Sequence, residues 1–519
     1  MANYVGLLVV LALAFATPAA AKAPTTDPIV VTQQGKVAGT TRDGVSVYLG
    51  IPYAAPPTGD RRWRAPAPVM AWKGTRLANQ YGSDCLQALF PLDGAPLRTT
   101  PSEDCLFLNV WTPGNAKPGA KLPVMVWIHG GGFVNGGSSP TIYSGASFAR
   151  DGIVFVSFNY RLGRFGFFSH PALAREGEGG NLGFLDQIAA LHWVQENIAA
   201  FGGDPSRVTL FGESAGGMSV HMLLQSPLAR GLFHAAIIQS GGGRDRSLPM
   251  ATLASAAKIG EAFAPGLSAE QLRALSADRV TGDLNMMTMA QPGYSGPMID
   301  GRTMLGAPVD VIATGGYPDV PLIVGANSAD GFPYITDKDK IFSPFGRDAE
   351  AARAIYDPDG AQSGLHVATH VSADQTFIEP ARAAARALVA KGRTVFLYRF
   401  DHIGVKFGLL VGGAPHASEI PYVFDTVKDM RDAIGAPDDA AVAKLTHRYW
   451  VNFAKTGRPD ASGHDGAGDV PPWPTLTVGD TRVQMIASQG ASHGEDPLTA
   501  RLDFAEKQAN GARRAGNSQ

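Results

Sequence analysis

Short apolar runs recur along this chain and alternate, through its central part, with segments that carry apolar residues at helical spacing. Strands that are apolar at nearly every position are typical of a parallel sheet covered by helices on both faces. We therefore expect an α/β fold with a mostly parallel central sheet. The runs cover residues 29–32, 45–49, 106–111, 122–129, 153–160, 208–211, 235–240, 321–325 and 395–400.

Helical patterns fill several of the intervals between these runs. The clearest covers residues 184–201 and ends before two glycines at 202–203. Residues 248–281 and 348–390 are helical in part, and we expect them to be insertions that roof the functional site. Because no internal repeat or low-complexity linker divides the chain, residues 22–519 are predicted to form one domain.

The most informative motif follows the run at 208–211 and reads GESAG at residues 212–216. A serine between glycines at a strand-to-helix turn is the nucleophile elbow of a serine hydrolase. The turn is too tight for flanking side chains, and it holds the hydroxyl exposed. It also places the Ala215 N–H at a helix N-terminus, where it can face a developing oxyanion. The motif therefore predicts Ser214 as a nucleophile.

A second match to the same pattern, GASHG at residues 490–494, lacks this context. No apolar strand precedes it, and Gln489, Glu495 and Pro497 give it the composition of a loop. With 62 glycines in 519 residues, a chance match to so short a motif is expected. We interpret this copy as a surface loop.

Three glycines follow the run at 122–129, in the sequence HGGGF at residues 129–133. Ligands of an open α/β sheet bind at the carboxyl ends of its strands. Consecutive glycines allow backbone N–H groups to converge on one point, so Gly131, Gly132 and Ala215 are the expected oxyanion-hole donors. A plain glycine turn is the alternative, and for His129 we expect a conformational role.

Acid and base candidates follow the last two runs. Asp330 comes shortly after residues 321–325, and His416 lies in a Gly/Pro loop after residues 395–400. The order serine, acid, histidine is that of an α/β-hydrolase. We expect His416 to act as general base and Asp330 to orient its imidazole. Asp300 is the competing acid, but it follows no clear strand.

Composition and charge narrow the functional classes. A hydrophobic content of 45% with 17% charged residues indicates a globular protein, and a net charge of −2 gives no electrostatic footprint for nucleic acid. The two cysteines, Cys85 and Cys105, are predicted to form a disulfide in an oxidising compartment, with two separate buried thiols as the alternative. No further cluster of ligand-type residues accompanies them, so no metal site is expected.

The N-terminus has the pattern of an export signal. Residues 5–16 form an apolar run, and Ala19-Ala20-Ala21 satisfies the small-x-small cleavage rule. The run is shorter than the roughly 18 residues that a membrane-spanning helix requires. We expect cleavage after Ala21, export to the periplasm or medium, and no stable membrane insertion.

Taken together, these motifs resemble the type-B carboxylesterases, also called the carboxylesterase/lipase or cholinesterase-like family. Residues 201–216 and 103–110 carry the two main signatures, and further matches lie at 129–133, 159–163, 413–422 and 452–457. The resemblance spans roughly residues 29–476. It implies the α/β-hydrolase fold, a triad of Ser214, Asp330 and His416, a Cys85–Cys105 disulfide, and neither a metal nor an organic cofactor.

Two positions depart from the family pattern. The family acid is usually glutamate, whereas this chain has Asp330, whose shorter side chain requires its loop to come about 1.5 Å closer to His416 for hydrogen-bond reach. The segment between Cys85 and Cys105 contains no tryptophan, with Phe90 its only aromatic residue. A choline esterase is therefore not expected, because the cation–π partner of a quaternary ammonium is missing from this loop.

The expected function is hydrolysis of small carboxylic esters through a covalent acyl-enzyme. An amidase or lactonase with the same residues is one alternative, and a non-catalytic binding or adhesion protein of this fold is another. The pattern predicts no oligomeric state. Residues next to the catalytic motifs are candidates for the substrate pocket, with ordinary core packing as the alternative for each: Phe133, Met218, Phe332 and Tyr334, and, from an insertion, Met286, Met287 and Met289.

Overall fold

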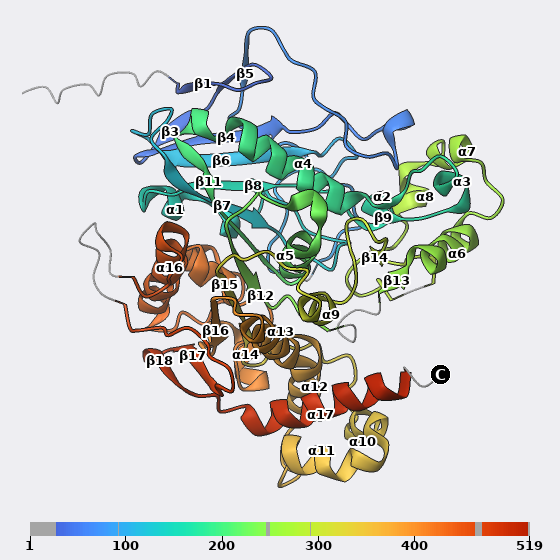
Figure 1. Ribbon diagram of the computed structural model, residues 1–519, viewed down its shortest axis with the longest axis vertical. Helices are drawn as coiled ribbons and strands as arrows, with labels where there is room; N and C mark the ends of the chain where they lie inside the picture. Colours follow the sequence, from blue (N-terminus) through green and yellow to red (C-terminus); the bar gives the residue numbers. More distant parts are fainter. Residues whose placement is uncertain (1–26, 92, 245–249, 291, 462–469, 517–519) are drawn as a thin grey trace, which may run out of the picture.

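A twisted central sheet crosses the molecule in the order β18-β17-β16-β15-β12-β11-β7-β8-β6-β4-β3 (Figure 1). The computed structural model describes residues 27–516 apart from 92, 245–249, 291 and 462–469. The neighbouring strands from β17 to β8 are parallel, and antiparallel pairs complete the sheet at both ends. The protein thus has the expected mostly parallel α/β-hydrolase sheet.

Each of the nine apolar runs coincides with a strand. The first run forms β1 (Ile29–Val31) in a separate small sheet with β2 (Lys36–Ala38) and β5 (Thr75–Leu77). The strands of the central sheet are β3 (Thr40–Arg42), β4 (Val45–Pro52), β6 (Phe107–Pro113), β7 (Leu122–Ile128), β8 (Val154–Phe158), β11 (Gly203–Glu213), β12 (Ala235–Gln239), β15 (Leu322–Asn327), β16 (Val395–Phe400), β17 (Arg482–Ala487) and β18 (Gly490–Glu495).

Alternate side chains of these strands belong to two hydrophobic cores, one on each face of the sheet. In β7, Val124, Val126 and Ile128 join the core that contains α4 (Leu182–Asn197), α5 (Ala215–Gln225) and α13 (Glu379–Ala390). Met125 and Trp127 join the core on the other face. That face is covered by α1 (Ala146–Arg150), α15 (Ile420–Val423) and α16 (Asp439–Thr456). Both faces of the parallel strands are therefore buried, which explains their apolar sequences.

Two expectations from the sequence are wrong. Residues 490–494 form most of strand β18 and not a surface loop. Their backbone hydrogen bonds are made by antiparallel pairing with β17. Because an edge strand of this kind contains few apolar residues, its sequence does not show the hydrophobic pattern by which the other strands were predicted.

The second concerns the two helical segments. They form α6 (Leu253–Phe263), α7 (Ala269–Arg273), α8 (Ala277–Thr281), α11 (Ala349–Tyr356), α12 (Gly364–Ala373) and α13. Helix α13 packs against the central sheet and is therefore part of the core and not an insertion. Phe377 does cover the site, because its ring stacks on His416 with 4.6 Å between ring centroids, and Met250 lines one of the two cavities described below. The other described residues of 248–281 and 348–390 line neither of these cavities.

The ends of the described chain lie apart. The long C-terminal helix α17 (Thr499–Gly516) lies in the lower part of Figure 1, above α11, and contacts α11 and α13. Within the described ranges, no helix is long and apolar enough to cross a membrane. The predicted export signal at residues 1–21 lies outside the described residues.

Candidate active site

Ser214 stands between the end of β11 and the start of α5, with φ 57° and ψ −122°. This conformation is rare for a residue with a side chain and requires a surrounding structure that enforces it. The turn requires glycine at position 216, because a Cβ atom there would lie 2.0 Å from the Ile128 carbonyl oxygen. The predicted elbow geometry is therefore present.

His416 and Asp330 lie in two loops that are joined by backbone contacts. The His416 Nδ1–H donates to Asp330 Oδ1 at 2.6 Å. The Ala329 N–H donates to the Ala414 carbonyl at 2.9 Å, and the Ala414 N–H donates to Ser328 Oγ at 2.9 Å. These bonds draw the two loops together, which gives the shorter aspartate side chain its reach.

Asp330 is fully buried, and its second oxygen is also satisfied. Oδ2 accepts hydrogen bonds from Ser240 Oγ at 2.6 Å and from the Asn327 N–H at 2.9 Å. The competing candidate, Asp300, instead accepts from the backbone N–H groups of residues 302–304 and from Asn181 and Thr303 side chains. Asp300 therefore stabilises a turn.

The other ring nitrogen of His416 contacts a residue that our sequence interpretation did not assign. Nε2 lies 3.2 Å from Glu213 Oε1, in a site where the Glu213 side chain is buried. Burial raises the pKa of Glu213 well above its ordinary range. For His416, burial lowers the pKa, but the negative charges of Glu213, Asp330 and Glu419 outweigh it and bring the pKa to about 9. The sequence feature that could have identified Glu213 is its position, because a charged residue directly before Ser214 stands in a turn that is buried.

Behind this pair lies a network of buried polar side chains. Gln239 Nε2 and Asn327 Nδ2 donate to the two oxygens of Glu419 at 2.9 and 2.7 Å, and Asn327 also donates to the Pro415 carbonyl. Burial raises the pKa of Glu419. The network fixes the loop that carries His416, and no sequence motif distinguished Gln239 beforehand.

The glycine loop follows β7 as predicted. Gly131 and Gly132 adopt φ angles of 105° and 62°, which favour glycine. Within the described residues, neither N–H donates to a protein acceptor. His129 is buried, its ring stacks on Tyr160, and burial lowers its pKa to about 4. His129 thus has the structural role expected of it.

Two cavities adjoin this loop. The first cavity is lined by the candidate residues Ser214 and His416, and we call it the catalytic cavity. It has a volume of about 700 Å³, and its lining also includes Gly131, Phe332 and Met286. Phe332 also contacts the His416 ring edge-to-face, with 4.8 Å between ring centroids.

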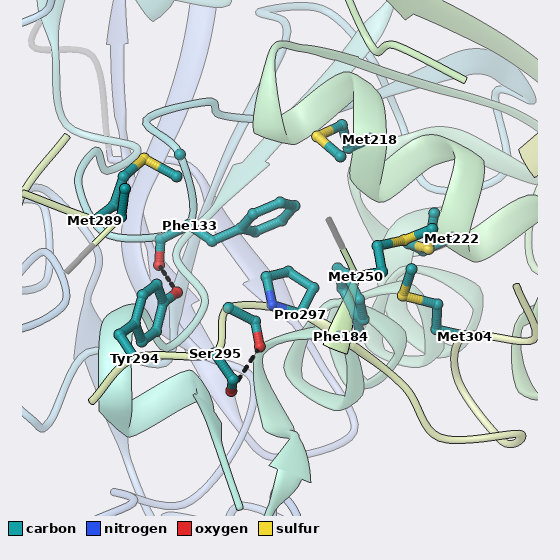
Figure 2. Close-up of a pocket in the computed structure, with 13 residues that line it drawn as sticks. Phe133, Phe184, Met218, Met222, Met250, Met289, Tyr294, Ser295, Pro297 and Met304 are labelled. Carbon is teal, nitrogen blue, oxygen red and sulfur yellow. Dashed lines mark hydrogen bonds between the residues drawn. The ribbon is translucent and has the colours of Figure 1, made fainter. Parts of the chain in front are cut away.

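The second cavity has a volume of about 290 Å³ and is lined by Gly132, Phe133, Met218 and Met289, among others (Figure 2). Tyr334 and Met287 line neither cavity, because their side chains point into solvent with exposed fractions of 72% and 64%. The expectation that Tyr334 lines the pocket is therefore wrong.

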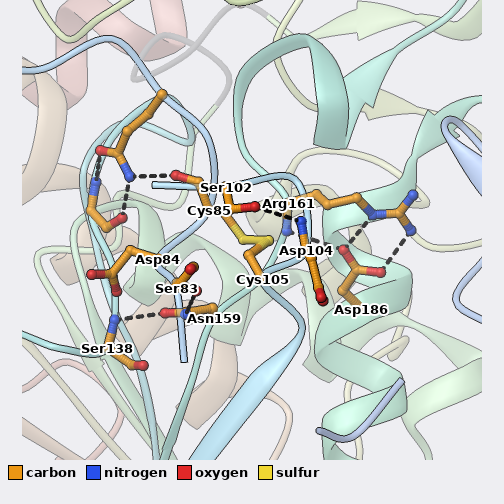
Figure 3. The surroundings of a disulfide bond; sticks show 12 residues. Ser83, Asp84, Cys85, Ser102, Asp104, Cys105, Ser138, Asn159, Arg161 and Asp186 are labelled. Carbon is orange, nitrogen blue, oxygen red and sulfur yellow. Dashed lines mark hydrogen bonds and ion pairs between the residues drawn. A yellow bond between two sulfur atoms is a disulfide. The ribbon is translucent and has the colours of Figure 1, made fainter. Parts of the chain in front are cut away.

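The predicted disulfide joins Cys85 to Cys105 (Figure 3). The segment that it closes contributes Phe90, Gly94 and Ala95 to the catalytic cavity. The Asn159 side chain accepts from the Ser138 N–H and donates to the Ser83 carbonyl, so it ties the residues just before Cys85 to the segment that follows the glycine loop. The disulfide loop is therefore part of the wall of the site.

The described residues contain no cluster of three or more His, Cys, Asp or Glu side chains that could hold a metal ion.

Comparison with known proteins identifies the family of this chain. The model of the carboxylesterase family matches residues 26–359 and 350–505. The para-nitrobenzyl esterase of Bacillus subtilis is 37% identical over 91% of this chain and 97% of its own length. The fumonisin B1 esterase of Sphingopyxis macrogoltabida is 38% identical over 86% of this chain and 85% of its own length.

Solved structures give the same answer for the fold. A structure of a PNB esterase superposes with a TM-score of 0.79 and 34% identity, and covers 92% of this chain and 99% of the esterase. A thermophilic PNB esterase superposes with a TM-score of 0.78. The ranges matched by the family model include the nucleophile elbow and the histidine loop. The chain belongs to the carboxylesterase family and is a carboxylic-ester hydrolase.

Proposed function

We propose that the protein hydrolyses small carboxylic esters through a Ser214–His416–Asp330 triad. The observation that carries this proposal is the 2.6 Å hydrogen bond from His416 Nδ1 to buried Asp330, at a cavity that Ser214 and His416 both line. That bond holds the tautomer in which Nε2 is free to accept a proton.

In acylation, Ser214 Oγ forms a bond to the ester carbonyl carbon while His416 takes the hydroxyl proton. The carbonyl oxygen becomes an oxyanion that accepts hydrogen bonds from the N–H groups of Gly131, Gly132 and Ala215. The intermediate collapses when His416 returns the proton to the leaving alcohol. Water then attacks the acyl-enzyme with His416 again as base, which releases the acid and restores Ser214.

The pair of Glu213 and His416 decides when this base is available. Burial raises the pKa of Glu213 and the neighbouring carboxylates raise the pKa of His416, so the two groups titrate as a coupled pair. When the proton resides on Glu213, the imidazole is neutral and can accept the proton of Ser214. Glu213 is therefore a positioning and proton-holding residue beside the triad.

The test is hydrolysis of p-nitrophenyl butyrate by the wild-type protein and by Ser214→Ala. Removal of a triad serine lowers turnover on the order of 10⁶-fold. We also expect a fluorophosphonate probe to label the wild type and not the variant. Equal, measurable rates for both proteins would assign the activity to another residue and overturn the proposal.

The protein is also proposed to be exported, on the basis of the signal pattern at residues 5–21 and the Cys85–Cys105 disulfide, a bond typical of oxidising compartments. N-terminal sequencing of the protein from fractionated cells is the test. A mature chain that begins at Lys22 outside the cytoplasm is expected, and an intact N-terminus confined to the cytoplasm would contradict export.

A further inference from the structure

Two phenyl rings pack against the imidazole of His416. Phe377 stacks on its face, with 4.6 Å between the ring centroids and 13° between the ring planes, and Phe332 packs on it edge-to-face. Phe332 lines the catalytic cavity, whereas Phe377 is buried and lines neither cavity. Phe377 therefore contacts the proposed base from a position that does not face the substrate.

Phe377 belongs to a π-helical turn. This turn, η6 (Asp374–Ile378), joins α12 to α13, and the Glu379 N–H donates to the Asp374 carbonyl, five residues back. Pro380 explains why the α-helical spacing is interrupted here, because proline has no N–H for the carbonyl four residues before it and its ring crowds that carbonyl. Turns of this kind are frequent at functional sites.

A buried ion pair anchors the turn to the C-terminal helix α17. Arg501 donates to both oxygens of Asp374, from Nε at 2.9 Å and from Nη2 at 2.8 Å. The Tyr356 hydroxyl also donates to Asp374 at 2.9 Å, and Asp374 is fully buried. Because a two-point pair of planar groups fixes direction as well as distance, α17 sets the orientation of the turn.

Apolar contacts join the same turn to the loop that carries the triad acid. Phe377 belongs to a small buried cluster with Ala326 of β15 and Leu502 of α17. Phe332, which follows the acid in its loop, packs on this cluster, and its N–H donates to Ser372 Oγ of α12 at 3.1 Å. The acid loop, the π-helical turn and the C-terminal helix are thus held as one unit around the histidine.

The stacked ring affects the two charge states of the histidine differently. The face of a phenyl ring carries partial negative charge, so it attracts a cation placed over it. His416 becomes a cation whenever it takes the proton of Ser214. Phe377 therefore favours the protonated base of the transition state over the neutral base of the resting enzyme, and its face also fixes the tilt of the imidazole ring.

We propose that Phe377 is a positioning residue for the catalytic base and that Arg501 of the C-terminal helix acts on the reaction through it. The proposal rests on the proposed function, because it takes His416 to be the base. It makes α17, which lines neither cavity, a part of the catalytic unit. The C-terminal helix then influences the rate of proton transfer without influencing the binding of the ester.

The first experiment measures kcat and KM for p-nitrophenyl butyrate between pH 5 and 10. Leucine in Phe377→Leu keeps the position apolar but has no π face, so we expect kcat above the rising limb to fall about threefold to tenfold, with KM within about a factor of two. The limb of kcat/KM should move to lower pH by about half a unit, because the protonated ring loses an attractive contact. Phe377→Tyr keeps the face and should retain both the rate and the limb.

Ile378→Val is the matched control, because Ile378 is buried in the same turn and its substitution loosens packing without removing a ring. None of these variants changes a charged group near the histidine, which are Glu213, Asp330 and Glu419 in the buried site and Asp93, Lys406, Arg431 and Asp432 in the cavity lining. Phe377→Met, which also lacks a π face, replaces Phe377→Leu if that protein does not fold. An unmoved limb in the folded variant, or an equal displacement in Ile378→Val, overturns the proposal.

The second experiment tests the link to the C-terminal helix with a double-mutant cycle. Arg501→Gln removes the two-point pair, and the control Glu506→Gln removes the ion pairs of the same helix to Arg382 and Arg386. We expect Arg501→Gln to lower kcat and displace the limb as Phe377→Leu does, and Glu506→Gln to do neither. Arg501→Gln/Phe377→Leu should be no slower than Phe377→Leu alone, whereas losses that multiply would overturn the route through Phe377.

A neutral version of the anchor guards against a folding defect. Arg501→Gln leaves a buried carboxylate unpaired, which strongly destabilises a fold, so Asp374→Asn/Arg501→Gln is measured in parallel under the same expectation. Labelling of Ser214 by a fluorophosphonate separates the two levels of the argument. A labelled wild type with an unmoved limb in every variant overturns the inference and upholds the proposed function, whereas a wild type that is not labelled at Ser214 overturns the proposed function itself.

Discussion

His416 Nε2 lies 3.2 Å from Glu213 Oε1, while Nδ1 of the same ring donates to Asp330 at 2.6 Å. The imidazole therefore has a carboxyl group at each of its nitrogens. Only the Asp330 contact matches the usual arrangement of a hydrolase triad. The Glu213 contact adds a negative charge at the nitrogen that must accept the proton of Ser214, and this makes catalysis sensitive to the charge state of Glu213.

Replacing that charge is expected to move the pH profile. Glu213 raises the pKa of His416, and the general base must be neutral, so activity increases as pH rises through this pKa. In Glu213→Gln the raising charge is absent, and the rising limb of kcat/KM should move to lower pH by at least about one unit. The measurement is kcat/KM for p-nitrophenyl butyrate between pH 5 and 10. A limb at the wild-type position would show that Glu213 carries no charge in the free enzyme.

We expect replacement of Asp330 to lower kcat strongly and replacement of Asp300 to leave kcat nearly unchanged. Asp330→Asn leaves the hydrogen-bonded loops in place but favours the wrong histidine tautomer, and kcat should drop by about 10³ to 10⁴. Asp300→Asn is the matched control, since Asp300 accepts hydrogen bonds in a turn and lies outside the lining of the catalytic cavity. Steady-state kinetics with one ester suffices. Similar losses in both variants would remove Asp330 from its assigned role.

The sequence predicted the parallel core of the sheet because strands buried on both faces are apolar at nearly every position, as in β7 and β15. The edge strand β18 could not be recognised in the same way. Its partly exposed residues bury little, and its pairing depends on the nearby β17 and not on its own composition.

In the candidate site, too, some residues could be predicted from local sequence and others could not. Ser214, Asp330 and His416 follow strands in local motifs, so their positions could be read from the chain. Glu419, Gln239 and Asn327 form one hydrogen-bonded network from segments up to 180 residues apart, and contacts of that kind arise only when the strands are assembled. Tyr334 shows the opposite limit, because proximity in sequence to Asp330 did not decide which way its side chain points.

Loss of the disulfide is expected to weaken both stability and binding. Closing a loop with a sequence separation of 20 stabilises a protein by about 3 kcal/mol, chiefly through the unfolded chain. We expect the double variant Cys85→Ala/Cys105→Ala to lose about this much free energy of unfolding in urea. Its KM should also rise, because the freed segment carries Phe90 and Ala95 of the cavity wall. Reduction of the wild type should reproduce both effects, and an unchanged KM would show that the wall is held by other contacts.

Phe332 and Tyr334 form a matched pair of aromatic residues with opposite expectations. Phe332 lines the catalytic cavity and packs edge-to-face on the His416 ring at 4.8 Å, whereas the Tyr334 side chain is 72% exposed. An aromatic pair of this kind contributes about 0.5–1.5 kcal/mol, so Phe332→Ala should lower kcat/KM by about threefold to tenfold. Tyr334→Ala should remain within about a factor of two of the wild type, as surface substitutions usually do. The two variants are compared on p-nitrophenyl butyrate at a pH above the rising limb, where the charge of His416 does not differ between them. A larger loss in Tyr334→Ala than in Phe332→Ala would mean that Tyr334 turns inward when substrate binds, and would restore it to the substrate pocket.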